Sequence, residues 1–271
     1  MPAIRQYISD SFVAPGLRGN PAAVCLLDTW LPDETMVMIA EENRYSETAF
    51  VVGTGPRFCL RWFTPRVEVD LCGHATLAAA YVLSRFHGHV ASNIVFETRS
   101  GDLTVGTRGD FYIIDLPRRA LQRTDVTAAT IEAATGVRPI EIQKAGPTII
   151  AVLPSADDVR KVEPRMELIE QIECNGLIVT AEGGGADFVS RFFGPRIGLG
   201  EDPATGSAHC GLAPFWSERL GKTELRALQV SPRGAELLCG VGERTVAIGG
   251  RVELFLTGEL NLGSSFRTVP A

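Results

Sequence analysis

The sequence predicts an α+β protein of two similar halves, each a strongly curved, mostly antiparallel sheet wrapped around one buried helix. Short apolar runs bounded by Gly and Pro recur along the chain, which is typical of strands. The segment Arg61–Arg66 returns at Arg191–Arg196 with four of six residues unchanged, and each copy precedes a glycine and an apolar helical run. An offset of 130 residues is too long for a solenoid repeat. We interpret it as a duplicated half, the alternative being chance similarity of Gly/Pro-rich turns.

The first half, residues 1–116, is expected to combine strands with two helices. Apolar runs and alternation predict strands at 4–12, 22–27, 48–52, 58–63, 93–98, 103–107 and 111–116. A helix is expected at 33–43 and another at 74–85. The second of these helices is apolar on nearly every face, so we expect it to be buried.

The second half, residues 117–271, repeats this mixture after a polar, charged linker at 117–125. Strands are predicted at 140–143, 148–153, 177–180, 188–193, 224–229, 236–239, 245–248 and 251–256. Short helices are expected at 156–161 and 166–172, and a longer, mostly helical stretch ends at Leu220.

Composition limits the classes of partner. A formal net charge of −6 without a basic run argues against nucleic acid. No apolar run is long enough for a membrane span, and residues 1–10 lack a signal-peptide core, so we expect a cytosolic protein. The six cysteines include no Cys-x-x-Cys pair, and with the four histidines they show no zinc-ligand spacing. We expect no disulfide, no metal and no cofactor.

The stretch from Glu201 to Cys210 predicts an anion site. A strand, a Gly-containing turn and a helix leave backbone N–H groups unpaired at the helix start, where the helix dipole favours a carboxylate. The first half offers the same arrangement at Gly73. We therefore expect the two helix starts, near Gly73 and near Gly206 and Ser207, to approach each other and to share one small carboxylate ligand.

Three side chains are candidates for acid–base chemistry. Glu47 is the only acidic residue in the run from Tyr45 to Gly53, which otherwise becomes wholly apolar, and desolvation there would raise its pKa. The alternative is an exposed glutamate paired with Arg44. Asp202 precedes the Gly206 turn and could equally be a helix N-cap. His74 lies in the first turn of a helix, where the dipole favours neutral imidazole, and could equally be a semi-buried structural histidine.

Ser207 and Cys72 are potential nucleophiles. Ser207 lacks the second glycine of a Gly-x-Ser-x-Gly elbow, which argues against a serine hydrolase. Cys72 directly precedes Gly73 at a helix N-terminus, a position that lowers the pKa of a thiol. The matching position of the other half is Thr205, which cannot serve as a partner thiol.

Four segments together resemble the signatures of the PhzF-like (phenazine biosynthesis protein) family: Gly19–Ala22, Tyr45–Phe50, Asp70–Ala78 and Glu201–Ala208. The later pair Gln229 and Arg233 fits these signatures as well. The resemblance covers nearly the whole chain. It implies the diaminopimelate epimerase-like fold of two pseudo-symmetric halves and, commonly, a homodimer.

The resemblance also implies a cofactor-free isomerase. Its catalytic glutamate matches Glu47, and residues matching His74, Asp202 and Ser207 line the site. Relatives that epimerise amino acids use two cysteines, at positions matching Cys72 and Thr205, and this chain keeps only the first.

Our leading hypothesis is an isomerase that moves a proton at carbon in a small carboxylate. Glu47, His74 and Asp202 are assigned to catalysis, and Asn20, Gly73, Gly206 and Ser207 to substrate binding. The alternatives are a racemase or epimerase that uses Cys72, and a small-carboxylate binding protein without turnover.

Overall fold

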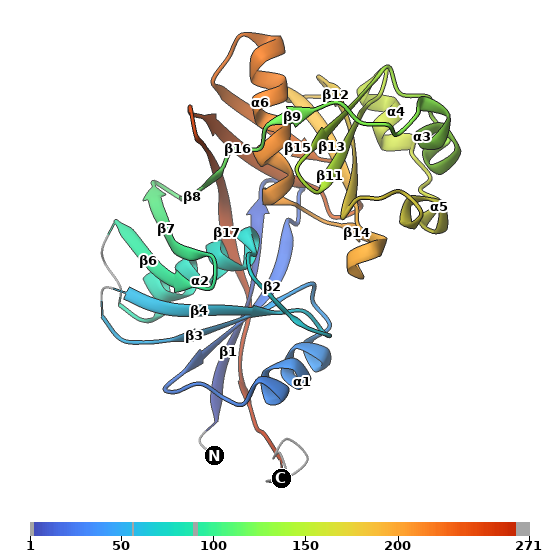
Figure 1. The fold of residues 1–271 in the computed structure, drawn as a ribbon. Helices are drawn as coiled ribbons and strands as arrows, with labels where there is room; N and C mark the ends of the chain where they lie inside the picture. The colour runs from blue at the N-terminus through green and yellow to red at the C-terminus, as the bar shows by residue number, and fades with distance from the viewer. Residues whose placement is uncertain (1–2, 56, 89–91, 264–271) are drawn as a thin grey trace. The chain divides into compact units, whose positions relative to one another are not determined.

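The chain divides into two compact units, each of which is described by itself. The computed structural model describes residues 3–55, 57–88 and 92–263 (Figure 1). Unit 1 comprises residues 1–11, 21–114 and 250–271, and unit 2 comprises residues 12–20 and 115–249. The expected division placed residues 117–271 in one half. The units differ from it because strands β1 (Ile4–Val13), β8 (Phe111–Pro117) and β17 (Thr245–Leu260) each have residues in both.

Unit 1 contains a mixed sheet in which antiparallel pairs outnumber parallel ones. Strand β2 pairs parallel with β3, β3 antiparallel with β4, β4 parallel with β6, and β6, β7 and β8 pair antiparallel in turn. The two-residue strand β5 adds to β4. The bounds are β2 (Asn20–Leu27), β3 (Thr48–Val52), β4 (Arg57–Phe63), β5 (Glu68–Val69), β6 (Asn93–Thr98) and β7 (Gly101–Arg108).

Unit 2 repeats this order of pairing. Strand β11 pairs parallel with β12, β12 antiparallel with β13, β13 parallel with β15, and β15, β16 and β17 pair antiparallel in turn. The two-residue strand β14 adds to β13 as β5 adds to β4. The bounds are β9 (Leu121–Gln122), β10 (Glu141–Ala145), β11 (Thr148–Val152), β12 (Gly176–Glu182), β13 (Phe188–Phe193), β14 (Glu201–Asp202), β15 (Glu224–Gln229) and β16 (Ala235–Val241).

Each parallel pair requires a crossover connection, and helices provide it. In unit 1, α1 (Asp33–Asn43) joins β2 to β3, and α2 (Gly73–Phe86) follows β5 on the way to β6. In unit 2, α4 (Ala156–Lys161) and α5 (Met166–Glu170) join β11 to β12, and α6 (His209–Leu220) leads to β15. Two 3-10 turns, Pro195–Ile197 and Gly206–Ala208, flank β14.

The longer helices α2 and α6 are the most buried. Nine residues of α2 are buried, and the helix packs against β3 and β7. Helix α6 is buried from His209 to Trp216 and packs against β15 and β16. A Cβ atom at Gly211 would lie 2.6 Å from Cβ of Ala145, so only glycine allows α6 to approach β10 this closely. Among the described residues, no helix is long and apolar enough to cross a membrane.

The repeated segment has a physical role that is the same in both units. Arg61 on β4 donates two hydrogen bonds to the carboxylate of Glu68 on β5, and its guanidinium lies 5.0 Å from the ring centre of Phe63. Arg191 on β13 makes the same bidentate pair with Glu201 on β14, and lies 5.0 Å from the ring centre of Phe193. Bidentate pairs fix orientation as well as distance. The arginine of each repeat therefore holds the short strand that precedes the buried helix.

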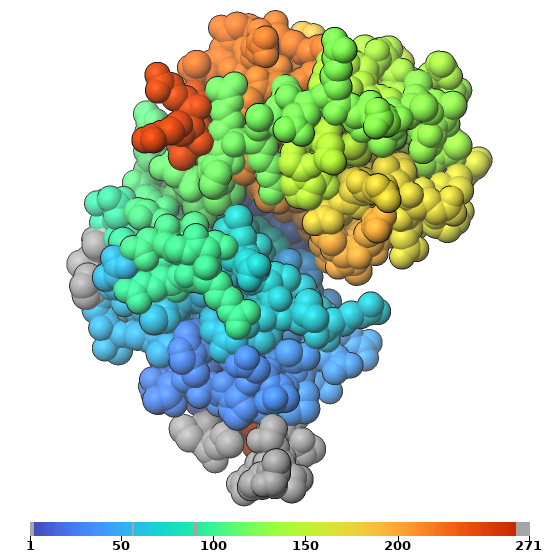
Figure 2. Space-filling model, in the orientation of Figure 1, coloured from blue at the N-terminus to red at the C-terminus, as the bar shows by residue number. Residues whose placement is uncertain are grey.

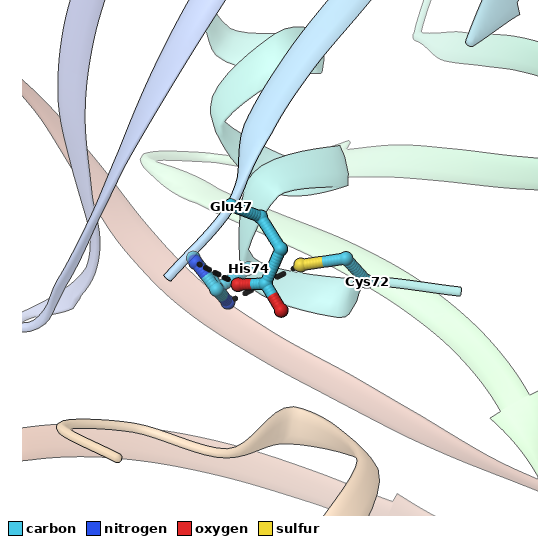
Figure 3. Close-up of side chains that lie close together, drawn as sticks. All are labelled: Glu47, Cys72 and His74. Atoms are coloured by element: carbon cyan, nitrogen blue, oxygen red, sulfur yellow. Dashed lines mark hydrogen bonds and ion pairs between the residues drawn. The ribbon is translucent and has the colours of Figure 1, made fainter. Parts of the chain in front are cut away.

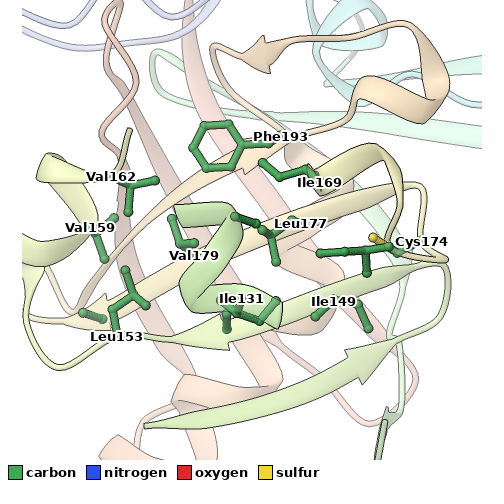
Figure 4. Close-up of a cluster of buried hydrophobic side chains, with 14 of the residues drawn as sticks. Ile131, Ile149, Leu153, Val159, Val162, Ile169, Cys174, Leu177, Val179 and Phe193 are labelled. Atoms are coloured by element: carbon green, nitrogen blue, oxygen red, sulfur yellow. The ribbon is translucent and has the colours of Figure 1, made fainter. Parts of the chain in front are cut away.

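Helices α1, α3, α4 and α5 cover the sheet faces of their own units. In unit 1, Met36, Ile39 and Ala40 of α1 pack with Phe50 and Phe63 of the sheet. In unit 2 a larger cluster joins β11, β12 and β13 to α3 (Ala128–Thr135), α4 and α5 (Figure 4). The green to yellow atoms of these helices lie on one flank of unit 2 in Figure 2.

Three expectations from the sequence need correction. The strands predicted at 245–248 and 251–256 are one continuous strand, β17, because Gly249 pairs with Leu238 of β16 and the strand runs on through Gly250. Helix α3 was not expected. Thr127 caps it by accepting a hydrogen bond from the Thr130 backbone N–H at 3.2 Å. The expected linker at 117–125 contains strand β9, which pairs with β10.

Removing the buried arginine should destabilise unit 2. Arg191 is only 9% exposed, and it also donates to the carbonyl oxygen of Val162, just past the end of α4, at 2.7 Å. Breaking a buried ion pair leaves an uncompensated carboxylate, so Arg191→Ala should lower the free energy of unfolding by about 3–5 kcal/mol in urea denaturation. Arg57→Ala is the control, because Arg57 also bridges two carboxylates but is 47% exposed. Equal effects of the two substitutions would contradict the assigned role.

Candidate active site

The chemistry-bearing residues predicted from the sequence form two groups, one in each unit. The Glu47 cluster consists of Glu47, Cys72 and His74 in unit 1. The Asp202 turn consists of residues 202–207 in unit 2.

Local structure holds Glu47 at the entry of a buried strand. Helix α1 ends where Arg44 adopts the left-handed conformation, with φ 56°, and β3 begins at Thr48. The Asn43 amide donates to the Thr48 hydroxyl at 3.1 Å, which ties together the two ends of this short connection. The side chain of Glu47 is 13% exposed. The structure therefore argues against the alternative hypothesis that Glu47 is exposed.

Cys72 and His74 are placed by the start of α2. Cys72 is the N-cap residue, and the Thr76 hydroxyl donates to its carbonyl oxygen at 2.6 Å. Ser11 donates to the carbonyl oxygen of His74 at 2.8 Å, which fixes the first helical turn. Both side chains are buried.

The three side chains of the Glu47 cluster converge (Figure 3). Nε2 of His74 lies 3.5 Å from Oε2 of Glu47, and Nδ1 of His74 lies 3.4 Å from Sγ of Cys72. Burial raises the pKa of the Glu47 carboxyl group above its ordinary value, and hydrogen bonds from Ser46 and Cys72 oppose the shift in part. A carboxyl group with a raised pKa is a stronger base when ionised, which suits it to accepting a proton and returning it.

The Asp202 turn is held by hydrogen bonds within unit 2. Oδ1 of Asp202 accepts from the Asn20 amide at 2.8 Å, and Oδ2 accepts from the Thr205 hydroxyl at 2.5 Å. The same Asn20 amide nitrogen donates to the carbonyl oxygen of Ala204 at 2.9 Å. Asn20, assigned to substrate binding from the sequence, thus orders the turn.

Gln229 and His209 also support this turn, and the sequence analysis assigned neither of them to the site. The Gln229 amide donates to the Asp202 carbonyl at 2.7 Å and accepts from the Thr205 backbone N–H at 2.8 Å. Nδ1 of His209 lies 2.9 Å from the Thr205 carbonyl oxygen, so it carries the proton. Burial lowers the pKa of His209 to about 4, and the ring is neutral at physiological pH. No spacing rule identifies Gln229, because it reaches the turn only through the pairing of β15 with β13.

Ser207 and Gly206 lie in the 3-10 turn that precedes α6, and Gly73 is the first residue of α2. Thr205 and Cys72 hold equivalent places, each directly before its helical segment. The Thr205 hydroxyl, however, is bonded to Asp202. Among the predicted residues, the structure brings Glu47 together with His74 in unit 1, and Asn20 together with Asp202 in unit 2.

Comparisons with known proteins show the fold and the class of protein to which this chain belongs. A hydroxyproline epimerase from Agrobacterium vitis superposes with a TM-score of 0.60 at 11% identity, covering 96% of this chain and 91% of that one, which shows a shared fold. An uncharacterized isomerase of Pseudomonas aeruginosa is 44% identical over 253 residues, covering 93% of this chain and 97% of that protein.

The family follows from two further findings. The sequence model of the family described as phenazine biosynthesis-like protein matches residues 9–258. A crystal structure of a PhzF family protein from Enterococcus faecalis is 43% identical, with a TM-score of 0.92, and covers 96% of this chain and all of that one. The chain belongs to the phenazine biosynthesis-like (PhzF) family, and it is an isomerase at the level of that family.

The raised pKa of Glu47 should be visible in the stability of the protein. Between the ordinary glutamate pKa of about 4.5 and the higher native value, the native state binds more protons than the unfolded state. The contribution of Glu47 to stability therefore falls as the pH rises through this window.

Glu47→Gln removes that contribution. Its melting temperature should match the wild type near pH 4.5 and exceed it increasingly toward neutral pH, as measured by calorimetry. Glu243→Gln, at an exposed turn, is the control and should show a constant difference. A pH-independent effect of Glu47→Gln would argue that the carboxyl group is ionised over the whole window.

Proposed function

We propose that this protein is a cofactor-independent isomerase that moves a proton at carbon in a small carboxylate substrate, with Glu47 as the general acid/base. The observation that carries the proposal is the burial of the Glu47 carboxyl group beside His74, with a raised pKa. Family membership and the relatives named isomerases support it.

The contacts of His74 suggest how the proton is managed. If Nδ1 carries the ring proton and donates to Sγ of Cys72, the thiol is oriented to donate to Glu47. Nε2 is then an acceptor that faces Oε2 of Glu47. In this arrangement His74 can take the proton that Glu47 removes from carbon and give it back. The histidine would thus act as a relay between two protonation states of Glu47.

The remaining predicted residues are assigned to binding and support. We propose that backbone N–H groups at Gly73, His74, Gly206 and Ser207 hold the substrate carboxylate, as the repeated strand–turn–helix pattern suggests. Donors of this kind also stabilise the enolate-like charge that forms when the C–H bond breaks. Asp202, with Asn20, would order the turn that contains Ser207. Asp202 is also the second candidate base.

We also infer that the sheet of each unit wraps around the long helix of that unit.

A thiol-based racemase is the runner-up. It would need a second nucleophile or base at Thr205, where this chain has a hydroxyl group that is hydrogen-bonded to Asp202. A binding protein without turnover is the alternative from another class, and failure to exchange any substrate proton would favour it. From the family resemblance we further propose that the protein is a cytosolic homodimer. Sedimentation equilibrium would test the oligomeric state.

Replacing Glu47 should remove the proposed activity. Glu47→Gln keeps the shape of the side chain but removes the base, so exchange should fall by about 10²–10⁴-fold. The measurement is incorporation of solvent deuterium into a panel of cyclic and acyclic amino and hydroxy acids, followed by NMR. Glu243→Gln should exchange like the wild type. Undiminished exchange in Glu47→Gln would transfer the role of base to Asp202.

Cys72 should contribute much less than Glu47. Because Thr205 replaces the second thiol, Cys72→Ala should retain more than about a tenth of wild-type kcat/KM, a loss below ~1.4 kcal/mol in transition-state stabilisation. The assay is the same deuterium exchange at several substrate concentrations. A loss of about a thousandfold or more would instead support the thiol racemase.

A further inference from the structure

The Glu47 cluster combines three different metal-ligating groups, although the sequence spacing predicted no metal site. A carboxylate oxygen, an imidazole nitrogen and a thiol sulfur of Glu47, His74 and Cys72 all lie within 4.8 Å of one another. We propose that this cluster binds one thiophilic divalent cation such as Zn²⁺, and that the bound cation inhibits the isomerase. The inhibition rests on the proposed function, whereas the binding itself does not.

Two of the ligand atoms already have the spacing that a tetrahedral ion requires. Zn–S and Zn–N bonds of about 2.3 and 2.0–2.1 Å place the sulfur and nitrogen ligands roughly 3.5 Å apart. Sγ of Cys72 and Nδ1 of His74 are 3.4 Å apart. The Glu47 carboxylate is hydrogen-bonded to the Cys72 thiol, and its ligand oxygen lies within 4.8 Å of the ligand atoms of the other two residues.

The charges and protons of this step balance. The thiol of Cys72 loses its proton to solvent as the S–metal bond forms, and a protonated Glu47 likewise releases its proton to solvent as the O–metal bond forms. Neutral His74 coordinates through Nδ1 after its ring proton has moved to Nε2. The thiolate and the Glu47 carboxylate together neutralise the two positive charges. Three protein ligands leave a fourth position for water or a substrate oxygen.

The positive end of the α2 dipole opposes a cation at this place. That effect is modest, and it falls off within the first turn of the helix. Two anionic ligands in direct contact with the ion outweigh it at this distance, because little solvent screens them.

Metal binding would remove the carboxylate that the reaction needs. A Glu47 side chain that coordinates a cation cannot take a proton from carbon, and His74 cannot relay one. Zinc bound at the cluster would then leave a folded but inactive enzyme, and a chelator would restore activity.

Cobalt(II) is a suitable probe, because a Co²⁺–thiolate bond gives a charge-transfer absorption in the near ultraviolet. Protein treated with chelator should bind one equivalent of Co²⁺ with this band, and Zn²⁺ should displace it. Cys72→Ser should lose the band, and His74→Gln and Glu47→Gln should each bind Co²⁺ about tenfold or more weakly.

Cys59→Ser is the matched control. The Cys59 thiol is half-buried and lies 3.8 Å from a Glu97 carboxylate oxygen, yet its removal should change nothing. Circular dichroism of each variant verifies the fold.

Three results would overturn the site: no band in the wild type at one equivalent, a band that survives in Cys72→Ser, or a band lost in Cys59→Ser. Binding of Co²⁺ or Zn²⁺ without any loss of deuterium exchange would overturn the inhibition. Absence of exchange in the metal-free wild type would count against the proposed function instead, and the spectroscopic result would still decide the binding.

Discussion

One arginine on a central strand, buried in unit 2 and half-buried in unit 1, organises each unit. Arg61 and Arg191 each hold a two-residue strand through a bidentate pair with a glutamate, and the segment that follows begins a buried helix. Burying a guanidinium and a carboxylate is costly unless both are fully paired, so the geometry of this contact is strongly constrained. The position of the residue before each helical segment, Cys72 or Thr205, follows from it. The two units are thus similar in that each uses the same arginine–glutamate pair to hold the short strand before its buried helix.

The same frame carries different chemistry in the two units. In unit 1 the residue before the helix is a thiol that contacts His74 and Glu47, and the carboxyl group there is desolvated. In unit 2 the equivalent residue is a hydroxyl bonded to Asp202, whose two oxygens both accept hydrogen bonds. A carboxyl group desolvated by burial is suited to exchanging protons, whereas one whose two oxygens both accept short hydrogen bonds is suited to ordering a loop. This contrast is why we assign the proton transfer to unit 1.

The role that we propose for Glu47 opposes stability. Placing an acidic side chain at the entry of an apolar strand destabilises the ionised native state, and an apolar or amide side chain would fit this environment better. Sites of this kind are where local preferences and catalytic needs diverge. The same closeness of thiol, imidazole and carboxylate that would allow proton relay also makes the cluster vulnerable to a thiophilic cation.

Much of this protein was determined by local sequence. Strands such as β3 and β13 were predicted with their bounds, because their apolar runs end at turn residues. Glu47 stood out as a lone acidic residue before an apolar strand, and the repeated arginine segment indicated two similar halves. The family resemblance then added the chemistry expected of His74 and Asp202.

Only the tertiary structure decided the contacts between residues that are distant in sequence. Gln229 reaches Thr205 because β15 pairs parallel with β13, and no local pattern encodes that pairing. The two glycines of β17 suggested a break, but neighbouring strands keep the ladder continuous through Gly249. The proximity of Cys72 and His74 to Glu47 likewise depends on α2 packing against β3. Periodicity reports which residues are buried, whereas strand pairing and helix packing decide which buried groups meet.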